Sequence, residues 1–542
     1  MTHTPLLSAR NLRVSFETAH VRREVVSGVS FDLTPGSCLA IVGESGSGKS
    51  VTARSLVGLA GAGSRVSADS LEFEGQDLLG LGDKAWRGLR GSRIGFVLQD
   101  ALVSLDPLRP VGDEIVEALA LHGIGTKASR RARALELLAE VGVPDPRTVE
   151  RQRPHELSGG LRQRALIASA IALHPNVVIA DEPTTALDVT VQAQVLDVLE
   201  QMKARGTAIL LISHDLSVVA RLADEILVMT GGEVVEQGPA ALVLGAPQHP
   251  YTQALLDAVP GEHTKGIALT GRDLGVPTRV VEELSIPVLE ARDLTKSFIG
   301  PDRVRRTVVS RAGFELHEGE TVGIVGESGS GKSTSARLVL GLETPDSGEV
   351  YFDGLPWSGI SRKARRQVRR EVAVVYQDPL SSFDPRWTVE RIIADNVGPT
   401  YSTTAARVAR VLELLDQVGL DQAVLRRKPL TLSGGQRQRV AIARALAADP
   451  RVIVLDEAVS ALDVSVQAQV LDLLSALQNR LGLSYLFISH DLGVIRHMSD
   501  RIVVMKEGRI VEQGDAEQLF TDPQHPYTQE LLASMPRLPQ PA

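Results

Sequence analysis

The sequence predicts an α/β fold that occurs twice in tandem along the chain. The first observation is an octapeptide, Gly-Glu-Ser-Gly-Ser-Gly-Lys-Ser, that is repeated letter for letter at residues 43–50 and 326–333. The second is a near-constant separation between other matching segments, as far as the His-Pro-Tyr-Thr-Gln runs at 249–253 and 525–529. The third is an alternation of buried-strand and helical patterns, which is typical of a mostly parallel sheet. So long a period indicates a duplicated domain rather than a solenoid.

The elements of the first half follow from these patterns. Apolar or alternating runs predict strands at residues 6–16, 28–42, 92–98, 176–180 and 208–212. A helix is predicted to begin at Lys49, helical periodicity predicts two helices within 111–143, and a further helix is predicted over 191–204. Together they place a mainly helical insert between Gln99 and Ser158. The second half repeats this order, which divides the chain into a first domain (1–261), a linker without periodicity (262–287) and a second domain (288–542).

Composition excludes several classes of protein. A hydrophobic content of 43% with 23% charged residues is typical of a globular chain. No apolar run reaches the roughly 18 residues of a membrane-spanning helix, and the first residues carry no secretory signal pattern. The single cysteine, Cys38, lies in a predicted core strand and suits a reducing compartment. A net charge of −8 does not favour a nucleic-acid partner.

The repeated octapeptide fits the pattern G-x-x-x-x-G-K-[ST] and follows an apolar run in both halves. Glycines allow backbone N–H groups to approach phosphates, the lysine supplies a positive charge, and the serine hydroxyl binds Mg²⁺. Two copies in matched contexts predict two nucleotide sites.

Three further motifs recur in both halves. Leu-Ser-Gly-Gly begins a helical stretch at 157–160 and 432–435, where a serine N-cap and bare N–H groups suit an anion. Apolar runs then end in Asp-Glu at 181–182 and 456–457. The aspartate can bind Mg²⁺ and the glutamate can polarise water. Finally, His214 and His490 each follow a strand.

Gln99 and Gln377 precede the Leu-Ser-Gly-Gly runs, and Ala-Leu-Asp follows the Asp-Glu pairs at 186–188 and 461–463. In this order, the motifs closely resemble Walker A, Q-loop, signature, Walker B, D-loop and H-loop of the ATP-binding cassette (ABC) family. The resemblance covers nearly the whole chain. It implies two nucleotide-binding domains, each with a P-loop core of mostly parallel sheet, an antiparallel β subdomain and the helical insert. It also implies that the two cassettes pair head to tail within one chain, with ATP between one cassette's Walker motifs and the other's signature.

The same resemblance implies a set of site residues. Those for nucleotide in the first half are Phe16, Gly43, Glu44, Ser45, Gly46, Ser47, Gly48, Lys49, Ser50, Val51, Ser158, Gly159 and Gly160. Those in the second half are Phe298, Gly326, Glu327, Ser328, Gly329, Ser330, Gly331, Lys332, Ser333, Thr334, Ser433, Gly434, Gly435 and Gln436. The catalytic residues are Glu182, Glu457, His214, His490, Gln99 and Gln377. The Mg²⁺ ligands are Ser50, Gln99, Asp181, Ser333, Gln377 and Asp456. Phe16 and Phe298 would stack on adenine; otherwise they are core residues.

Two departures from the family pattern stand out. Leu161 replaces the glutamine of the first signature, and residues 458–460 read Ala-Val-Ser where the first half has Pro-Thr-Thr. Neither removes a chemically active group, so we expect both sites to be competent.

The His-Pro-Tyr-Thr-Gln runs resemble the C-terminal motif of dipeptide, oligopeptide and nickel importer ATPases; otherwise they are proline turns with a docking tyrosine. The resemblance implies an ATPase that energises an importer, most readily of dipeptides or oligopeptides. Nickel, glutathione and peptide antibiotics remain alternative solutes. A soluble twin-cassette translation factor is less favoured because the linker is short and unpatterned. A DNA-repair or chromosome ATPase would need zinc cysteines or a coiled-coil insertion.

The cofactors implied are ATP and Mg²⁺, and no iron–sulfur cluster is expected because no cysteine follows either His-Pro-Tyr run. The implied partners are two integral membrane permease subunits and an extracytoplasmic solute-binding protein, with the chain peripheral on the cytoplasmic face of the cell membrane. We expect the segments 100–110 and 378–387 to contact the permeases through exposed Leu105, Leu108, Phe383 and Trp387; otherwise these side chains fold back on the insert.

Overall fold

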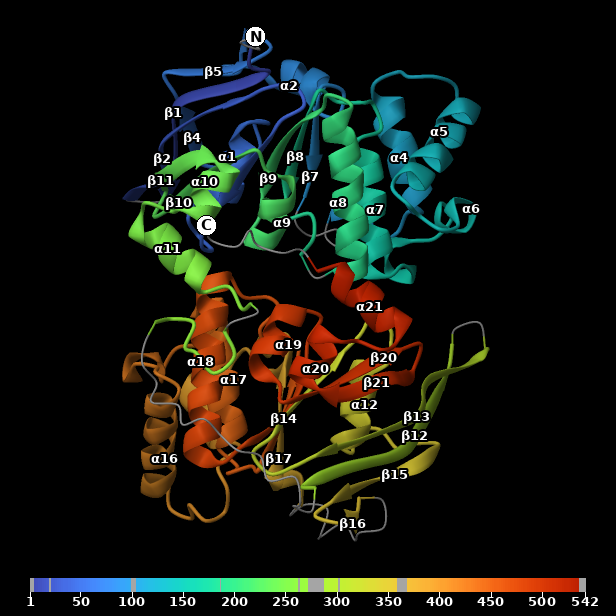
Figure 1. The fold of residues 1–542 in the computed structure, drawn as a ribbon. Coiled ribbons are helices and arrows are strands. Elements are labelled where there is room, and N and C mark those ends of the chain that lie inside the picture. Colours follow the sequence, from blue (N-terminus) through green and yellow to red (C-terminus); the bar gives the residue numbers. More distant parts are fainter. Residues whose placement is uncertain are drawn as a thin grey trace. The chain divides into compact units, whose positions relative to one another are not determined.

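A computed structural model describes residues 4–18, 21–98, 104–185, 187–261, 264–271, 287–300, 303–357 and 368–535. The chain divides into two compact units, one reaching Leu256 and one spanning Asp257–Met535 (Figure 1). Within the described residues, no helix combines the length and apolar character needed to cross a membrane.

The first unit contains two sheets. The larger sheet has the strand order β11-β10-β3-β9-β8-β7 and is parallel except at β11. Its strands are β3 (Cys38–Val42), β7 (Ile94–Val97), β8 (Val177–Asp181), β9 (Ala208–Ile212), β10 (Glu225–Thr230) and β11 (Glu233–Pro239). The smaller, antiparallel sheet consists of β1 (Leu7–Thr18), β2 (Val21–Leu33), β4 (Ser64–Ser67), β5 (Ser70–Phe73) and β6 (Gln76–Asp77).

Helices complete this unit. Those outside the insert are α1 (Lys49–Ser55), α2 (Asp83–Leu89), α8 (Val189–Ala204), α9 (Leu216–Leu222), α10 (Ala240–Gly245) and α11 (Pro250–Asp257). Those of the insert are α4 (Val111–Leu121), α5 (Lys127–Glu140), α6 (Pro146–Val149) and the short η1 (Pro154–Glu156). The insert lies between β7 and the helix α7 (Gly159–Ala170), within the segment that the sequence predicts. Central strands such as β3, β8 and β9 are buried at every position, because both faces of the large sheet are covered, in part by the antiparallel sheet.

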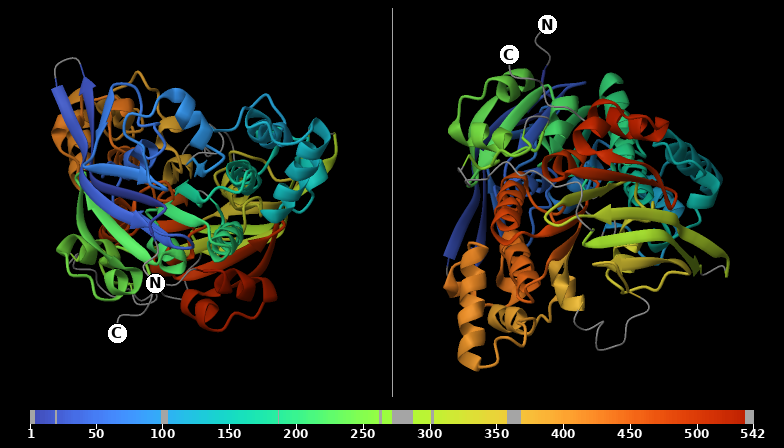
Figure 2. Two further views of the ribbon diagram at one scale, coloured as in Figure 1. Left: turned by 90° about the horizontal axis from the view of Figure 1, so that it is seen from above. Right: turned by 60° about the horizontal axis from the view of Figure 1, so that its bottom comes forward.

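The second unit repeats this architecture. Its larger sheet has the order β17-β18-β19-β14-β20-β21. The strands are β14 (Thr321–Val325), β17 (Val372–Tyr376), β18 (Val452–Asp456), β19 (Ser484–Ile488), β20 (Arg501–Lys506) and β21 (Arg509–Asp515). The antiparallel sheet consists of β12 (Leu289–Ile299), β13 (Arg305–Leu316), β15 (Ser347–Phe352) and β16 (Leu355–Pro356). Figure 2 shows β12 and β13 as a long yellow-green hairpin.

The helices of the second unit correspond to those of the first. They are α12 (Lys332–Val339), α14 (Pro379–Ser382), α15 (Val389–Ala394), α16 (Thr404–Gln417), η2 (Gln422–Val424), η3 (Pro429–Thr431), α17 (Gly434–Leu446), α18 (Val464–Leu481), α19 (Leu492–Met498), α20 (Ala516–Thr521) and α21 (Pro526–Ala533). Each unit has its own apolar core between the large sheet, the antiparallel sheet and the helix after the phosphate loop.

Part of the predicted linker lies against the second unit. The backbone N–H groups of Leu269 and Thr270 each donate to the Asp472 carboxylate at 2.9 Å. The Lys265 Nζ donates to the Ser499 carbonyl at 2.9 Å. Leu269 and Asp472 are buried, so residues 264–271 form a segment docked on α18, which we call the strap. The linker residues 262–263 and 272–286 lie outside the described residues.

Cys38, at the start of β3, is buried, and burial raises the pKa of its thiol to about 12. Its place in a core strand confirms the prediction from the sequence.

Candidate functional site

Strand pairing brings the predicted motifs to one edge of each large sheet. In the first unit β8 lies between β7 and β9, and β9 pairs with β3, all in parallel. Asp181 is in register with Ile212, and in the second unit Asp456 is in register with Ile488. The carboxyl ends of parallel strands share an edge, so the phosphate loop, the Asp-Glu pair and the histidine converge there.

Each phosphate loop leaves its strand and enters a helix that begins at the predicted lysine, Lys49 or Lys332. The Lys49 ammonium is buried and donates to the Gly43 carbonyl at 2.6 Å and the Glu44 carbonyl at 2.8 Å. Lys332 makes the same two bonds, at 2.7 and 2.8 Å, to Gly326 and Glu327. The loop carbonyls therefore hold the lysine ammonium inside the loop. Phosphate oxygens bound there would compete with these carbonyls for the ammonium.

The serine after each lysine is bound to the aspartate at the end of the neighbouring strand. Ser50 Oγ donates to Asp181 Oδ1 at 2.9 Å, and Ser333 Oγ donates to Asp456 Oδ1 at 3.1 Å. Residues more than a hundred positions apart thus form one oxygen cluster in each unit.

Asp181 suits a hard cation. Burial raises the pKa of its carboxyl, an effect that the Ser50 hydrogen bond only partly offsets. Its second oxygen, Oδ2, is buried and has no hydrogen-bond partner among the described residues. A buried carboxylate oxygen beside a serine hydroxyl is the kind of ligand set that Mg²⁺ prefers. These residues therefore fit the predicted ion, as do Ser333 and Asp456.

Glu182 follows Asp181 in a strained backbone conformation, with φ at +50°, and Glu457 has φ at +51°. Few non-glycine residues adopt this region, and such strain gathers at functional sites. Glu182 Oε1 lies 3.3 Å from His214 Nδ1, and Glu457 Oε2 lies 3.5 Å from His490 Nδ1. Burial opposes charge on both partners, but the contact prevails: it lowers the pKa of Glu182 and raises that of His214. The second pair shifts in the same directions.

The two glutamates differ in one neighbour. The Thr185 hydroxyl donates to Glu182 Oε2 at 3.0 Å, which further lowers the pKa of that carboxyl. At the matching position Ser460 donates at 3.0 Å to the Glu457 backbone carbonyl instead. The Gln377 side chain donates to the Ser460 hydroxyl at 3.4 Å, so the predicted Q-loop residue of the second unit reaches this cluster. Gln99, its counterpart, lies outside the described residues.

The signature serines are N-caps of the helices that follow. Ser158 Oγ accepts from Leu161 N at 3.4 Å, and Ser433 Oγ accepts from Gln436 N at 3.3 Å. Gln436 returns the bond, its side chain accepting from Ser433 N at 3.2 Å, which completes a capping box. Leu161 has no such group, so the departure in the first signature removes half of a cap.

The two signature glycines meet different surroundings. A Cβ on Gly160 would lie 2.6 Å from the Val191 side chain, and one on Gly435 would lie 2.5 Å from Val466. A Cβ on Gly159 would meet nothing within 4 Å. Close packing against the next helix thus explains the second glycine but not the first, which leaves Gly159 open to a ligand.

The predicted adenine-stacking residues lie on matching strands, β1 and β12. Phe16 packs against the core of its unit, whereas Phe298 is exposed on one side with the Lys296 ammonium 5.3 Å from its ring centre. Stacking on adenine stays a prediction for both.

The prediction of exposed apolar side chains after the Q-loops is wrong for two residues. Leu105 is 2% exposed and Phe383 is 6% exposed, and the Arg444 guanidinium lies 5.0 Å from the Phe383 ring centre. Both side chains are therefore covered by the protein itself and do not offer apolar area to a partner. Leu108 is 77% exposed, as expected, and Trp387 is half-buried. Residues 100–103 lie outside the described residues.

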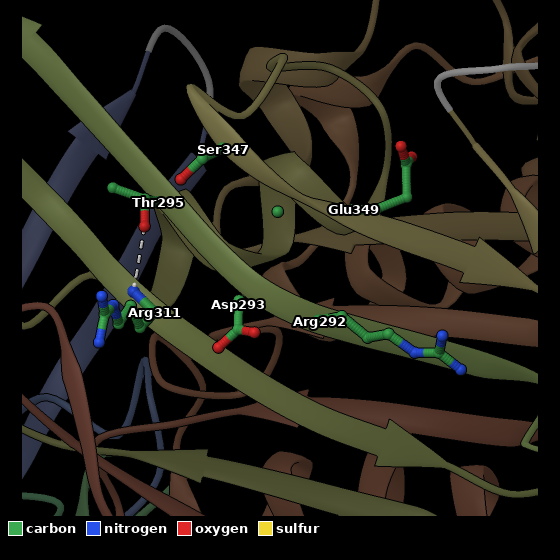
Figure 3. A pocket seen from close by; sticks show the side chains of 7 residues that line it. Arg292, Asp293, Thr295, Arg311, Ser347 and Glu349 are labelled. Atoms are coloured by element: carbon green, nitrogen blue, oxygen red, sulfur yellow. Dashed lines mark hydrogen bonds between the residues drawn. The ribbon is translucent and has the colours of Figure 1, made fainter.

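A hollow on the antiparallel sheet of the second unit lies apart from these motifs in the sequence. It is lined by residues of β12, β13 and β15, including Arg292, Thr295, Arg311 and Glu349 (Figure 3). The Arg311 N–H donates to Thr295 Oγ1 at 3.2 Å across it. None of its residues was predicted to bind nucleotide.

Comparison with known proteins gives consistent matches over both halves. Residues 26–185 and 309–460 match the family model described as ABC transporter. Residues 235–279 and 511–542 match the one described as oligopeptide/dipeptide transporter, C-terminal region.

Similar chains match nearly end to end. The peptidoglycan transport ATP-binding protein YejF of Agrobacterium fabrum is 44% identical, over 98% of this chain and 96% of that protein. The oligopeptide transport ATP-binding protein OppD of Mycobacterium tuberculosis is 41% identical, over 99% of each. The glutathione import ATP-binding protein GsiA of Pectobacterium atrosepticum is 42% identical, over 98% of this chain and 89% of that protein.

Proposed function

This chain belongs to the ABC transporter family, and from that premise we propose that it binds and hydrolyses ATP to energise a membrane importer of dipeptides or oligopeptides. The observation that carries the ATPase is the duplicated Ser–Asp cluster beside a phosphate-loop lysine and a Glu–His pair. The peptide class is supported by the C-terminal region that follows each cassette and by relatives named for oligopeptide, glutathione and peptidoglycan transport.

The residues divide the chemistry between them. The lysine ammonium leaves the loop carbonyls for the β- and γ-phosphate oxygens, whose negative charge outcompetes a neutral carbonyl. Mg²⁺ held by Ser50 and Asp181 would neutralise phosphate charge, and Ser333 with Asp456 would do the same in the second cassette. Glu182 and Glu457, kept ionised by their histidines, accept a hydrogen bond from the attacking water and orient it.

The two cassettes complete each other's sites in this proposal. Ser433 and Gly435 serve the site that contains Lys49, and Ser158 and Gly160 serve the site that contains Lys332. Gly159, with open space around its α-carbon, supports a role for the signature start in binding phosphate.

Ser433→Arg tests this pairing, because it puts bulk and charge at the start of a signature helix in the second cassette. After photo-crosslinking of ATP and proteolysis, the amount of label can be assigned to each cassette. The label at the Lys49 site should decrease. A loss confined to the Lys332 site would exclude the head-to-tail arrangement.

Two integral membrane permeases and an extracytoplasmic solute-binding protein complete the proposed importer, with this chain on the cytoplasmic face of the membrane. Leu108, exposed within the first insert, is the apolar side chain that we propose contacts a permease. Leu108→Asp should reduce transport while the isolated chain keeps its ATPase activity. Leu242→Asp, at a 63% exposed residue of α10, is the matched control and should leave both activities intact.

Uptake by the reconstituted importer decides the solute class. Labelled dipeptides and oligopeptides should be imported in an ATP-dependent way, in competition with each other. Uptake of nickel alone, or ATP hydrolysis without any transport in the full assembly, would contradict the proposal.

A further inference from the structure

The His-Pro-Tyr-Thr-Gln motif builds the start of helices α11 and α21. His249 Nδ1 accepts from the Tyr251 N–H at 3.1 Å, which caps the helix, and Pro250 occupies its first position. The Gln253 side chain donates to the Pro247 carbonyl at 3.0 Å. His525 and Gln529 make the same bonds in the second cassette, at 3.1 and 2.9 Å. Most of the motif's polar groups are thus used to fix one helix end.

A glutamate anchors this helix end to the large sheet. The Glu236 carboxylate of β11 accepts from the N–H groups of Gln248 at 2.8 Å and His249 at 3.1 Å. Glu512 of β21 does the same for Gln524 and His525, at 2.7 and 3.1 Å. These hydrogen bonds fix the start of the helix, and with it the backbone of the tyrosine that follows.

The tyrosine hydroxyl reaches the phosphate loop. Tyr251 Oη accepts from the Glu44 N–H at 3.1 Å, although the two residues are 207 positions apart. Tyr527 Oη accepts from the Glu327 N–H at 3.1 Å in the second cassette. Glu44 and Glu327 are the second residues of the two loops, so the same bond is built twice in one chain.

The tyrosine and the loop lysine hold opposite ends of one peptide unit. The Gly43 carbonyl and the Glu44 N–H belong to the same planar group, so fixing one end orients the other. Lys49 donates to that carbonyl at 2.6 Å while Tyr251 accepts from that N–H. The 326–327 peptide is held in the same way between Lys332 and Tyr527.

The loop is also seated tightly at this peptide. Gly43 has φ at +147°, and a Cβ there would lie 2.1 Å from the Met229 carbonyl at the end of β10. Gly326 has φ at +148° and the same clash with Met505. The position of the peptide is therefore fixed on the glycine side by close backbone contact, and the orientation of its N–H is fixed by the tyrosine.

We propose that Tyr251 and Tyr527 are positioning residues for the two ATP sites. Each hydroxyl fixes the peptide on which the Walker A lysine rests, so that the loop is preformed when phosphate arrives. This inference rests on the proposed ATPase function and gives the His-Pro-Tyr motif a part in it. Preorganisation lowers the cost of binding, so the effect falls on nucleotide affinity more than on the chemical step.

Tyr→Phe at both positions removes the hydroxyls and keeps the rings. The ring of Tyr527 is buried with the Lys506 ammonium 4.3 Å from its centre, a contact that phenylalanine preserves. One net hydrogen bond to each loop is lost, so we expect the Kd for ATP to rise about 2- to 10-fold. KM for ATP should rise by a similar factor, with a smaller change in kcat and in the unfolding midpoint.

The binding assay uses the full chain and a fluorescent ATP analogue in a Glu182→Gln, Glu457→Gln background that prevents turnover. Single Tyr251→Phe and Tyr527→Phe variants, with photo-crosslinking assigned to each cassette, should weaken labelling of their own phosphate loop. Tyr485→Phe is the matched control. The buried Tyr485 hydroxyl donates to the Leu474 carbonyl at 2.9 Å, and neither residue belongs to a phosphate loop. Tyr485→Phe should lower the unfolding midpoint and leave the Kd unchanged.

The possible results distinguish a failure of the role of the tyrosines from a failure of the proposed ATPase function. A wild-type chain that binds ATP, with Phe variants of equal Kd and KM, would show that the tyrosine is a structural anchor only and overturn the inference. A wild-type chain that does not bind ATP would overturn the proposed function and the inference with it. A midpoint shift without a change in Kd counts against the inference as well.

Discussion

Glu182 Oε1 and His214 Nδ1 lie 3.3 Å apart at the ends of two neighbouring strands, β8 and β9. The same pair, Glu457 and His490, recurs in the second cassette at 3.5 Å. Each carboxylate is half-buried, and although burial raises its pKa, the contact with the histidine lowers it by more and favours the ionised form. The role that we propose for the glutamate, to orient the attacking water, requires this ionised form.

Replacing both glutamates with glutamine should leave ATP binding intact and reduce turnover by about 100-fold or more, as expected for loss of a general base. Binding by calorimetry and phosphate release in the assembled transporter provide the two readouts. Asp197→Asn, at a surface carboxylate paired with Arg221, is the control for the change of charge. Near-normal hydrolysis in the Glu182→Gln, Glu457→Gln chain would show that neither residue acts on the water.

The same pair predicts a pH dependence of stability. The pKa of His214 lies above its ordinary 6.5, so its contribution is complete below pH 6.5 and is lost as pH rises through the folded value. The pKa of Glu182 lies below its ordinary 4.5, so its contribution is complete above pH 4.5 and is lost as pH falls through the folded value. Both are present between pH 4.5 and 6.5.

His214→Gln should therefore lower the unfolding midpoint of the first cassette more at pH 6 than at pH 8.5. Calorimetric scans at the two pH values measure the difference. His155→Gln, at an exposed histidine, should show no such trend. An equal effect of His214→Gln at both pH values would mean that His214 is not protonated in the folded protein at pH 6.

Leu161 and Gln436 allow a reciprocal test of the signature caps. Leu161→Gln should complete the capping box at Ser158 and stabilise the first cassette by about 0.5–1 kcal/mol. Gln436→Leu should destabilise the second by a similar amount, because Ser433 N loses its acceptor. Opposite shifts of the two unfolding transitions confirm the assignment, and shifts of equal sign contradict it.

The signature glycines separate packing from binding. Gly160→Ala should destabilise the first cassette by about 1–3 kcal/mol, because the added methyl overpacks against Val191. Gly159→Ala meets open space and should not. If Gly159→Ala nevertheless weakens ATP labelling at the Lys332 site, the first glycine contacts nucleotide; unchanged labelling would remove it from the site.

One buried carboxylate, that of Asp472, binds two backbone N–H groups of the strap. Asp472→Ala removes the acceptor of two backbone N–H groups and should expose residues 264–271 to limited proteolysis, with a loss of about 1.5–3 kcal/mol. Asp472→Asn keeps one acceptor oxygen, so its cleavage rate and its loss of stability should lie between those of the natural chain and Asp472→Ala. Asp416→Ala, exposed on α16 of the same unit, is the control. Unchanged cleavage in Asp472→Ala would mean that the strap is held elsewhere.

Sequence patterns predicted the four strands of the first large sheet that carry or adjoin the motifs, β3, β7, β8 and β9, because short apolar runs there end in chemistry-bearing residues. The strands β10 and β11 were not predicted, and the run 28–42 was predicted as one strand although residues 34–37 separate β2 from β3. Lys49, Asp181, Glu182 and His214 were placed by this logic and do converge. The strap escaped prediction because two of its contacts are made by the backbone N–H groups of Leu269 and Thr270, which leave no side-chain pattern. The Tyr251–Glu44 bond escaped because it joins the two ends of a cassette. Leu105 was misjudged because a short loop sequence does not reveal which face the insert covers.

The burial of Cys38 makes the natural chain a convenient background for thiol labelling. It is the only cysteine, and a pKa of about 12 leaves almost no thiolate at neutral pH. Maleimide probes will therefore react with introduced cysteines and spare the native one. One probe near each signature serine and one near each phosphate loop would test by energy transfer whether the distance between these positions changes when ATP is added, without first removing a residue from the core.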